Sequence, residues 1–313
     1  MAPRNVPIAE AAGEDTRTLK LTSRSTYLRE RFLRYIFLTC AFIAVLAVLF
    51  IFVFVGARGW PIFVKVGVIP FLFGTDWAPT AKPPSYGIFP MLFGSFAVMV
   101  GALVLGTPLA VGTAIFLSEV ASPRVRSIVR PAVELLAGVP SVVYGFFGLL
   151  VLRPIIAAMS GTLGFGLLAG WIILAIMIVP TIAALSEDAL RSISTGTREA
   201  SYAMGATTWQ TIYKVLVPSA RFGILDAVIL GMGRAIGETM AVLMVIGNAP
   251  VIPKSIFAPF STITTQIVID MSYATGDHQT ALFGMGIVLL VISMSFVAAV
   301  RFVARLSGSE EEA

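Results

Sequence analysis

Long apolar runs alternate with short polar segments along most of this chain. A helix needs about 20 mainly apolar residues to cross the hydrocarbon core of a bilayer. Six runs approach or exceed that length, and we predict that each forms a membrane-spanning helix. They cover residues 33–57, 89–117, 133–156, 167–185, 224–247 and 281–300. The pattern therefore predicts an all-α integral membrane protein with six transmembrane helices.

The composition supports a membrane protein and leaves little room for a soluble domain. Hydrophobic residues make up 57% of the 313 residues and charged residues only 12%, where soluble domains have about a quarter charged. Residues 1–32 mix polar residues and proline without periodicity, which predicts a flexible tail, and residues 306–313 form a short acidic tail. Cys40, the single cysteine, is expected to pack in the core. The single histidine, His278, predicts a surface residue of an outer loop, so neither a metal nor a cofactor is expected.

Lysine and arginine are distributed unevenly between the predicted loops. With the N-terminus inside, the inner segments contain 16 of them and the outer loops contain 5. Because positive residues favour the cytoplasmic side, we expect both termini in the cytoplasm. The net charge of +5 then reflects topology and contact with lipid, and it does not indicate nucleic-acid binding.

A polar segment, residues 199–218, separates the fourth and fifth apolar runs. Residues 199–204 predict a short helix, Gly205 a turn with positive φ, and residues 207–217 a second helix that Pro218 ends. These helices would form a knob on the cytoplasmic surface. The dipeptide Gly-Lys of a Walker A loop does not occur in the sequence, so we expect a chain that is not an enzyme and takes its energy from another subunit.

This segment resembles the cytoplasmic signature of ATP-binding-cassette importer permeases. In that signature Glu-Ala-Ala, a glycine and a later Leu-Pro mark the coupling helices that dock on the ATPase. Glu199, Ala200, Gly205 and Pro218 match it, whereas Ser201 replaces the second alanine and Val217 the leucine. The resemblance implies a six-span permease domain over residues 33–305, with a coupling loop over about residues 187–221.

Two charged residues, Arg234 and Glu238, interrupt the fifth apolar run. They are four residues apart, so they would share one face of a continuous helix. Arg234 lies about 15 Å inside the start of the run, near the bilayer midplane, where a charge costs roughly 2.5 to 3.5 kcal/mol. Two interpretations stay open: an ion pair that joins helices, or a path for an ion or substrate.

Arginine suits an anionic substrate because its planar fork offers parallel donors and keeps its charge. Glu238 could accept a hydrogen bond from the O–H of hydrogen phosphate, whereas fully deprotonated sulfate would only be repelled. The pair therefore favours phosphate.

Three motifs, residues 231–248, 136–145 and 73–77, resemble phosphate-specific permeases of the PstC type. This resemblance implies that Arg234, Glu238 and Thr239 line a phosphate path in a bacterial inner membrane. It also implies three kinds of partner: a second permease of the PstA type, two ATP-binding-cassette ATPase subunits and an extracytoplasmic phosphate-binding protein.

Other functions stay open at this stage. A sulfate or molybdate permease would share the polar segment at residues 199–218. An ion-coupled carrier or channel would also use intramembrane charges, but it would not need that segment, and no inverted repeat is visible. A membrane scaffold that reports phosphate status to a sensor kinase could coexist with transport.

Overall fold

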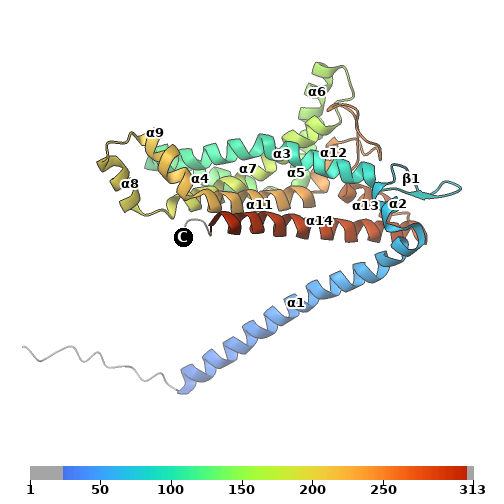
Figure 1. Cartoon of the computed structure of the whole chain (residues 1–313), viewed down its shortest axis with the longest axis horizontal. Coiled ribbons are helices and arrows are strands. Elements are labelled where there is room, and N and C mark those ends of the chain that lie inside the picture. The colour runs from blue at the N-terminus through green and yellow to red at the C-terminus, as the bar shows by residue number, and fades with distance from the viewer. Residues whose placement is uncertain (1–23, 309–313) are drawn as a thin grey trace, which may run out of the picture. The chain divides into compact units, whose positions relative to one another are not determined.

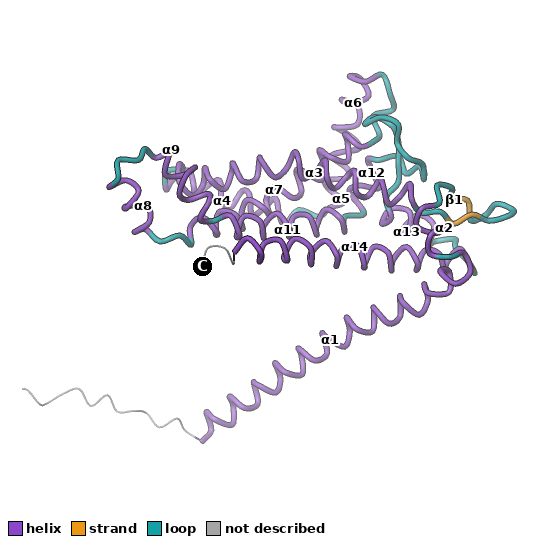
Figure 2. Tube along the Cα trace, in the orientation of Figure 1, coloured by secondary structure: helices purple, strands orange, loops and turns teal. Residues whose placement is uncertain are grey.

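The structure is a computed structural model that describes residues 24–308. Helices make up most of this part of the chain (Figures 1 and 2), as the sequence predicted. Within the described residues the strands are limited to a short antiparallel hairpin of β1 (Trp77–Ala78) and β2 (Ser85–Tyr86). The chain divides into two compact units, one ending at Val53 and the other starting at Phe54.

The first unit contains most of helix α1 (Arg24–Val66). Residues 24–32 of the predicted tail are helical, and residues 1–23 lie outside the described part of the chain, so a flexible tail stays a prediction there. The side chain of Cys40 is exposed, which contradicts the predicted packing in the core. Residues 31–54 are nearly all apolar and exposed, as expected of a helix that lipid or another subunit surrounds.

Within residues 24–308, five helical segments are long and apolar enough to cross a membrane. A sixth results if two helices joined at a bend of 68°, Thr208–Ser219 and Arg221–Gly237, are taken as one span. The predicted number of spans is therefore reached only with a bent helix. The five segments are Arg31–Val66, Phe89–Val120, Ser141–Ser160, Leu167–Arg191 and Asp277–Ala298.

Helices α3 (Phe89–Ile115) and α7 (Leu167–Arg191) form the centre of the second unit. Their buried side chains, with those of α11 (Arg221–Gly237), form the largest apolar cluster. The indole N–H of Trp171 on α7 donates to the carbonyl of Ala97 on α3 at 2.8 Å, and the Trp171 ring lies directly over Gly101. A glycine is needed there because the two helices approach closely.

The third apolar run bends sharply at Pro140, so its candidate span covers Ser141–Ser160 and not the predicted residues 133–156. Helix α4 (Pro123–Gly138) ends before an extended Val139, and α5 (Ser141–Phe147) begins after Pro140. A residue before proline is driven away from helical geometry, which explains the corner. The chain then continues through a π-helical turn (Gly148–Leu152) into α6 (Arg153–Ser160).

The fifth apolar run is also broken, so the predicted continuous helix over residues 224–247 is wrong. Helix α11 ends at Gly237, Glu238 has extended backbone (φ −71°, ψ 130°), and α12 (Met240–Val245) follows. Arg234 and Glu238 therefore do not share a helical face. The broken spans meet each other: a Cβ on Gly145 of α5 would lie only 3.1 Å from the Cα of Ala241 on α12.

The second unit has two distinct ends in Figure 1. One carries α8 (Thr195–Ala203) and α9 (Thr208–Thr211) and is called the knob end. The other carries the hairpin, α2 (Val68–Phe73) and α13 (Ile263–Met271) and is called the hairpin end. Helix α14 (Asp277–Gly308) starts at the hairpin end and runs toward the knob end.

The contact between Gly101 and Trp171 gives a stability prediction. Replacing Gly101 with Val should lower the yield of folded protein and its Tm in detergent, because the new side chain overlaps the indole ring; overpacking of this kind costs roughly 1–3 kcal/mol. Gly112→Val is the matched control on the same helix, since a Cβ at Gly112 meets open space. Equal Tm values for the two variants would contradict the close packing of α3 on α7.

Candidate substrate path and coupling surface

Arg234 lies in the last turn of α11 and is half-buried. Its Nη1 donates to the hydroxyl of Thr181 on α7 at 3.1 Å. No ion pair joins Arg234 to Glu238 or to any other carboxylate of the described residues. The proposed bracing of two helices by an Arg234–Glu238 pair is therefore not supported, and most guanidinium donors stay available to a ligand.

Tyr144 brings the first turn of α5 into the neighbourhood of Arg234. Tyr144 lies close enough to Arg234 for the two side chains to interact electrostatically. The Tyr144 hydroxyl donates a hydrogen bond to the carbonyl of Leu136 at 2.7 Å. The bond spans the corner between α4 and α5 and satisfies a carbonyl at the end of α4. Arg234 therefore lies near the corner before α5 as well as near the break after α11.

Glu238 holds the break between α11 and α12. Its Oε1 accepts a hydrogen bond from the backbone N–H of Ala241 at 3.1 Å, in the first turn of α12. Its carbonyl accepts from the hydroxyl of Thr264 on α13 at 3.2 Å. Thr239 is half-buried, and its hydroxyl donates to the carbonyl of Gly237. One carboxylate oxygen of Glu238 is thus used as a helix cap, while Oε2 makes no hydrogen bond within the described chain.

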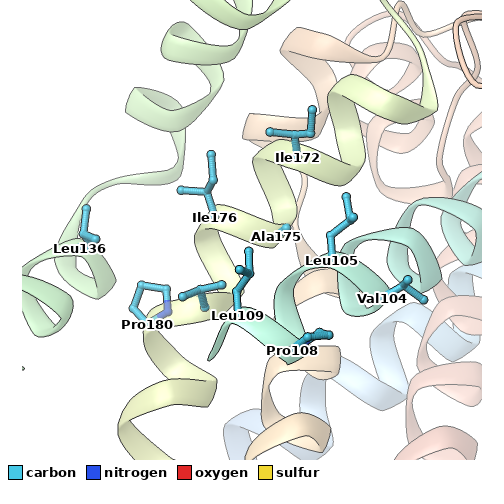
Figure 3. Close-up of a pocket in the computed structure, with 10 residues that line it drawn as sticks. Val104, Leu105, Pro108, Leu109, Leu136, Ile172, Ala175, Ile176 and Pro180 are labelled. Carbon is cyan, nitrogen blue, oxygen red and sulfur yellow. The ribbon is translucent and has the colours of Figure 1, made fainter. Parts of the chain in front are cut away.

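A separate cavity of about 570 Å³ opens between α3, α7 and the end of α4 (Figure 3). Figure 3 shows aliphatic side chains such as Leu105 and Ile176 around it, with Pro108 and Pro180 at its border. A phosphate placed there would lose its hydration without gaining a hydrogen-bond donor from a side chain. The lining of this cavity therefore offers no binding group to an anion.

The knob has the two-helix geometry that the sequence predicted. Gly205 has φ of 82°, and the second helix starts with a capping box in which Thr207 and Gln210 bond each other's backbone N–H. Ser201 and Thr211 join the two helices through their hydroxyls at 2.9 Å. Ser201 thus has a definite role at the position where the signature has alanine.

Pro218 does not end the second helix, which corrects the predicted boundary. The helix continues through a π turn (Ile212–Leu216) into α10 (Val217–Ser219) and stops after Ser219. Pro218 is the second residue after this π turn, and the helix ends one residue after Pro218.

The outward face of the knob is apolar in places and uncovered. Met204 is 89% exposed and Trp209 68% exposed, with Tyr213 also exposed beside them in sequence. Glu199, Ala200 and Pro218 are exposed on the same segment. On the inner face Ile212 and Leu216 pack in a small core with Leu190. Large exposed apolar side chains on a polar segment are typical of a protein docking site.

Arg198 fastens the knob to two spans. Its guanidinium donates to both carboxylate oxygens of Glu119, at 2.9 and 3.3 Å, just beyond the end of α3. It also donates to the carbonyls of Leu190 and Ile193 at the end of α7. A planar guanidinium can make all these bonds at once, so one side chain ties the knob to the ends of α3 and α7.

Thr181 and Thr264 were not predicted from the sequence as site residues, and the position of His278 was predicted wrongly. Thr181 and Thr264 are single hydroxyls in apolar surroundings, and the sequence offers no sign that they contact Arg234 and Glu238. His278 was expected on the surface, but it is only 8% exposed and lies 3.1 Å from the carboxylate of Asp270. Its position beside an exposed Asp277 gave no sign of that burial.

Comparison with known proteins identifies the family. Residues 106–307 match the family described as "Binding-protein-dependent transport system inner membrane component". The chain belongs to this family. The matched region contains the knob, Arg234 and both interrupted spans of the permease.

Curated relatives of the permease cover most of its length. It is 46% identical to the "Probable ABC transporter permease protein YqgH" of Bacillus subtilis, over 86% of this chain and 89% of that protein. It is 36% identical to the "Phosphate transport system permease protein PstC" of Mesorhizobium japonicum, over 74% of this chain and 77% of that one.

A solved structure supports the fold of the permease. A chain of a bacterial ABC transporter "involved in the import of the acidic polysaccharide alginate" superposes with a TM-score of 0.64 at 16% identity. The match covers 90% of this chain and 98% of that one. The permease therefore has the helical fold of ABC importer permeases.

The capping bond of Glu238 gives a prediction that does not depend on substrate. Glu238→Gln keeps an acceptor for the Ala241 N–H and should leave the Tm in detergent nearly unchanged. Glu238→Ala removes the acceptor and should destabilise by about 1 kcal/mol, the usual effect of losing a cap. The two variants are each other's control, and an equal Tm for both would contradict the capping role.

Proposed function

We propose that this permease is the membrane-spanning subunit of an ATP-driven importer of inorganic phosphate. The observation that carries the proposal is the position of Arg234, a half-buried cation in the last turn before the break after α11, with no carboxylate partner among the described residues. A relative that shares 36% of its residues is named as a phosphate permease, which supports phosphate as the substrate.

The groups around Arg234 suit hydrogen phosphate. The guanidinium offers parallel N–H donors to two phosphate oxygens, and its bond to Thr181 at 3.1 Å limits its rotation. The second carboxylate oxygen of Glu238 could accept the phosphate O–H, because the capping bond occupies only Oε1. Sulfate has no O–H at neutral pH and would be repelled by the same oxygen. Thr239, at the break, completes the proposed path.

The knob is the proposed contact with the ATPase. Glu199, Ala200, Gly205 and Pro218 belong to an exposed segment whose apolar side chains have no cover within the described chain. Its ties to α3 and α7 through Arg198 provide a rigid route from the ATPase to the spans. The permease itself would hydrolyse no ATP, and its partner subunits would do so.

The complete transporter would contain a second permease of the PstA type, two ATP-binding-cassette ATPase subunits and an extracytoplasmic phosphate-binding protein. The knob end would face the cytoplasm of a bacterial cell, and the hairpin end would face the binding protein. Both termini would then be cytoplasmic, in agreement with the 16 to 5 distribution of lysine and arginine. A permease for sulfate or molybdate is the competing proposal, and an ion-coupled carrier would leave the exposed knob unexplained.

Uptake by variants of Arg234 tests the substrate. In proteoliposomes that contain the full complex, Arg234→Lys should lower phosphate uptake at least about tenfold, because an ammonium keeps the charge but not the paired donors. Arg124→Lys, at an exposed position of α4, is the matched control and should transport normally. Labelled phosphate and labelled sulfate should be measured for both proteins. Sulfate uptake above phosphate uptake by the unaltered complex would contradict the proposed substrate.

The knob gives an independent prediction about coupling. Gly205→Val places a β-branched residue at φ of 82°, which should distort the turn and abolish phosphate uptake while the complex still inserts. Gly196→Val is the matched control on α8, since a Cβ there meets nothing closer than 3.9 Å. Uptake, ATPase activity and complex yield should be compared. Normal uptake and ATPase activity in Gly205→Val would remove the knob from the coupling route.

A further inference from the structure

Asp270 is a buried carboxylate at the hairpin end for which the transport mechanism so far has no use. It lies on α13, is only 2% exposed, and accepts hydrogen bonds from several groups. The indole N–H of Trp77 on β1 donates at 3.0 Å, the hydroxyl of Tyr273 at 2.6 Å, and Nε2 of His278 on α14 lies at 3.1 Å. Asp270 thus joins the hairpin, α13 and α14.

The cluster is charged and fully bonded at neutral pH. Burial raises the pKa of Asp270, but hydrogen bonds from Tyr273, Gln266, Trp77 and His278 lower it further, and the net pKa lies below its usual value. Its contribution to stability is therefore present above the ordinary pKa of a carboxyl and is lost only as the pH falls through the lowered one. The Asp270 carboxylate and burial raise the pKa of Tyr273 to about 12, so Tyr273 remains a donor.

The other end of α13 is fixed beside the proposed substrate path. The hydroxyl of Thr264 donates to the carbonyl of Glu238 at 3.2 Å, and the N–H of Ile263 donates to Ser95 on α3 at 3.0 Å. The Ser261 hydroxyl donates to Oε1 of Gln266 at 2.9 Å, one turn before Asp270. Buried hydrogen bonds therefore hold α13 at its first turn as well as at Asp270.

This arrangement makes α13 a short rigid connection between two places that function must link. One place is the hairpin end, where Tyr273 is exposed and where Lys65 and Asp277 form an exposed ion pair. The other is the break at Glu238, one turn beyond Arg234. A helix held by hydrogen bonds at both ends transmits displacement instead of absorbing it.

We propose that Asp270 is a positioning residue for transport: it locks α13 to the hairpin and to α14, so that docking of the binding protein at the hairpin end moves the break at Glu238. The inference rests on the proposed function, because it takes the hairpin end as the docking side. Asp270 itself does not touch the substrate. It acts through Thr264 and the Glu238 carbonyl.

The test compares variants at the two ends of α13 in the complete complex, reconstituted with phosphate-loaded binding protein. Asp270→Asn keeps the size of the side chain, but its amide N–H groups then compete with the hydrogen-bond donors that face Asp270. Thr264→Val removes only the hydroxyl that donates to the carbonyl of Glu238. Each should lower the maximal uptake rate, per assembled complex, about tenfold, a usual size for coupling between sites. The concentration of binding protein at half-maximal rate should change little. Ser272→Ala is the matched control, since Ser272 is exposed and its hydroxyl bonds only the carbonyl of Ile269, while its backbone N–H, which bonds the carbonyl of Asp270, is kept.

The double variant separates a connection from two local defects. If α13 links the sites, Asp270→Asn with Thr264→Val should be no slower than the slower single variant, because either change already breaks the same route. If the fractional losses of uptake rate in the two single variants multiply in the double variant, the proposal is overturned. A loss expressed only as weaker docking, or normal uptake in both single variants, would overturn it as well.

Trp77→Phe is a less disruptive variant that is tested if Asp270→Asn does not assemble. Trp77→Phe removes one N–H donor and keeps an aromatic ring, and it should slow uptake without weakening docking. All ratios are taken against the unaltered complex with the oxyanion that this complex takes up. If that oxyanion is sulfate, the phosphate proposal fails while the Asp270 comparison remains valid. If phosphate is transported and the variants behave normally, only the role of Asp270 fails.

Discussion

The need to pair every backbone polar group inside a membrane governs the centre of this permease. A break in a spanning helix exposes N–H and C=O groups that lipid cannot satisfy. Both breaks are therefore closed by side chains: Tyr144 bonds the carbonyl of Leu136 across the corner of the third span, and Glu238 bonds the N–H of Ala241 across the break of the fifth. The packing of α5 on α12, made possible by Gly145, brings these two hydrogen bonds close to each other and to Arg234.

The knob and the hairpin end are connected to this centre by different means. At the knob, Arg198 makes bonds to Glu119 and to carbonyls at the end of α7, so the link is charged and lies at the ends of two long helices. At the hairpin end, the link is the short helix α13 with its buried hydrogen bonds. A transporter that works by alternating access needs rigid elements on both sides of a fixed site, and these two links supply them to the surroundings of Arg234.

The hydrophobic pattern was sufficient for the spans and the knob but not for the breaks. Span positions follow from local composition, and the turn at Gly205 follows from the single residue type that tolerates its φ. The end of α4 at Gly138 follows from the nearby Pro140, whereas the break after Gly237 has a partner far away in sequence, Thr264. For the same reason Thr181 and the burial of His278 escaped prediction: the residues that contact them come from other elements, and a single sequence carries no record of such contacts.

The break after α11 decides what the Glu238 carboxylate does. On an unbroken helix, this carboxylate and Arg234 would neutralise each other and leave little affinity for an anion. With the helix ended at Gly237, the carboxylate instead caps α12 at 3.1 Å and its carbonyl is held by Thr264 at 3.2 Å. Any shift of α12 relative to α13 must strain one of these bonds, while Arg234 stays attached to α7 through Thr181. Movement at the break would therefore change the distance between the cation and the capping carboxylate, the two groups that we propose to bind the anion.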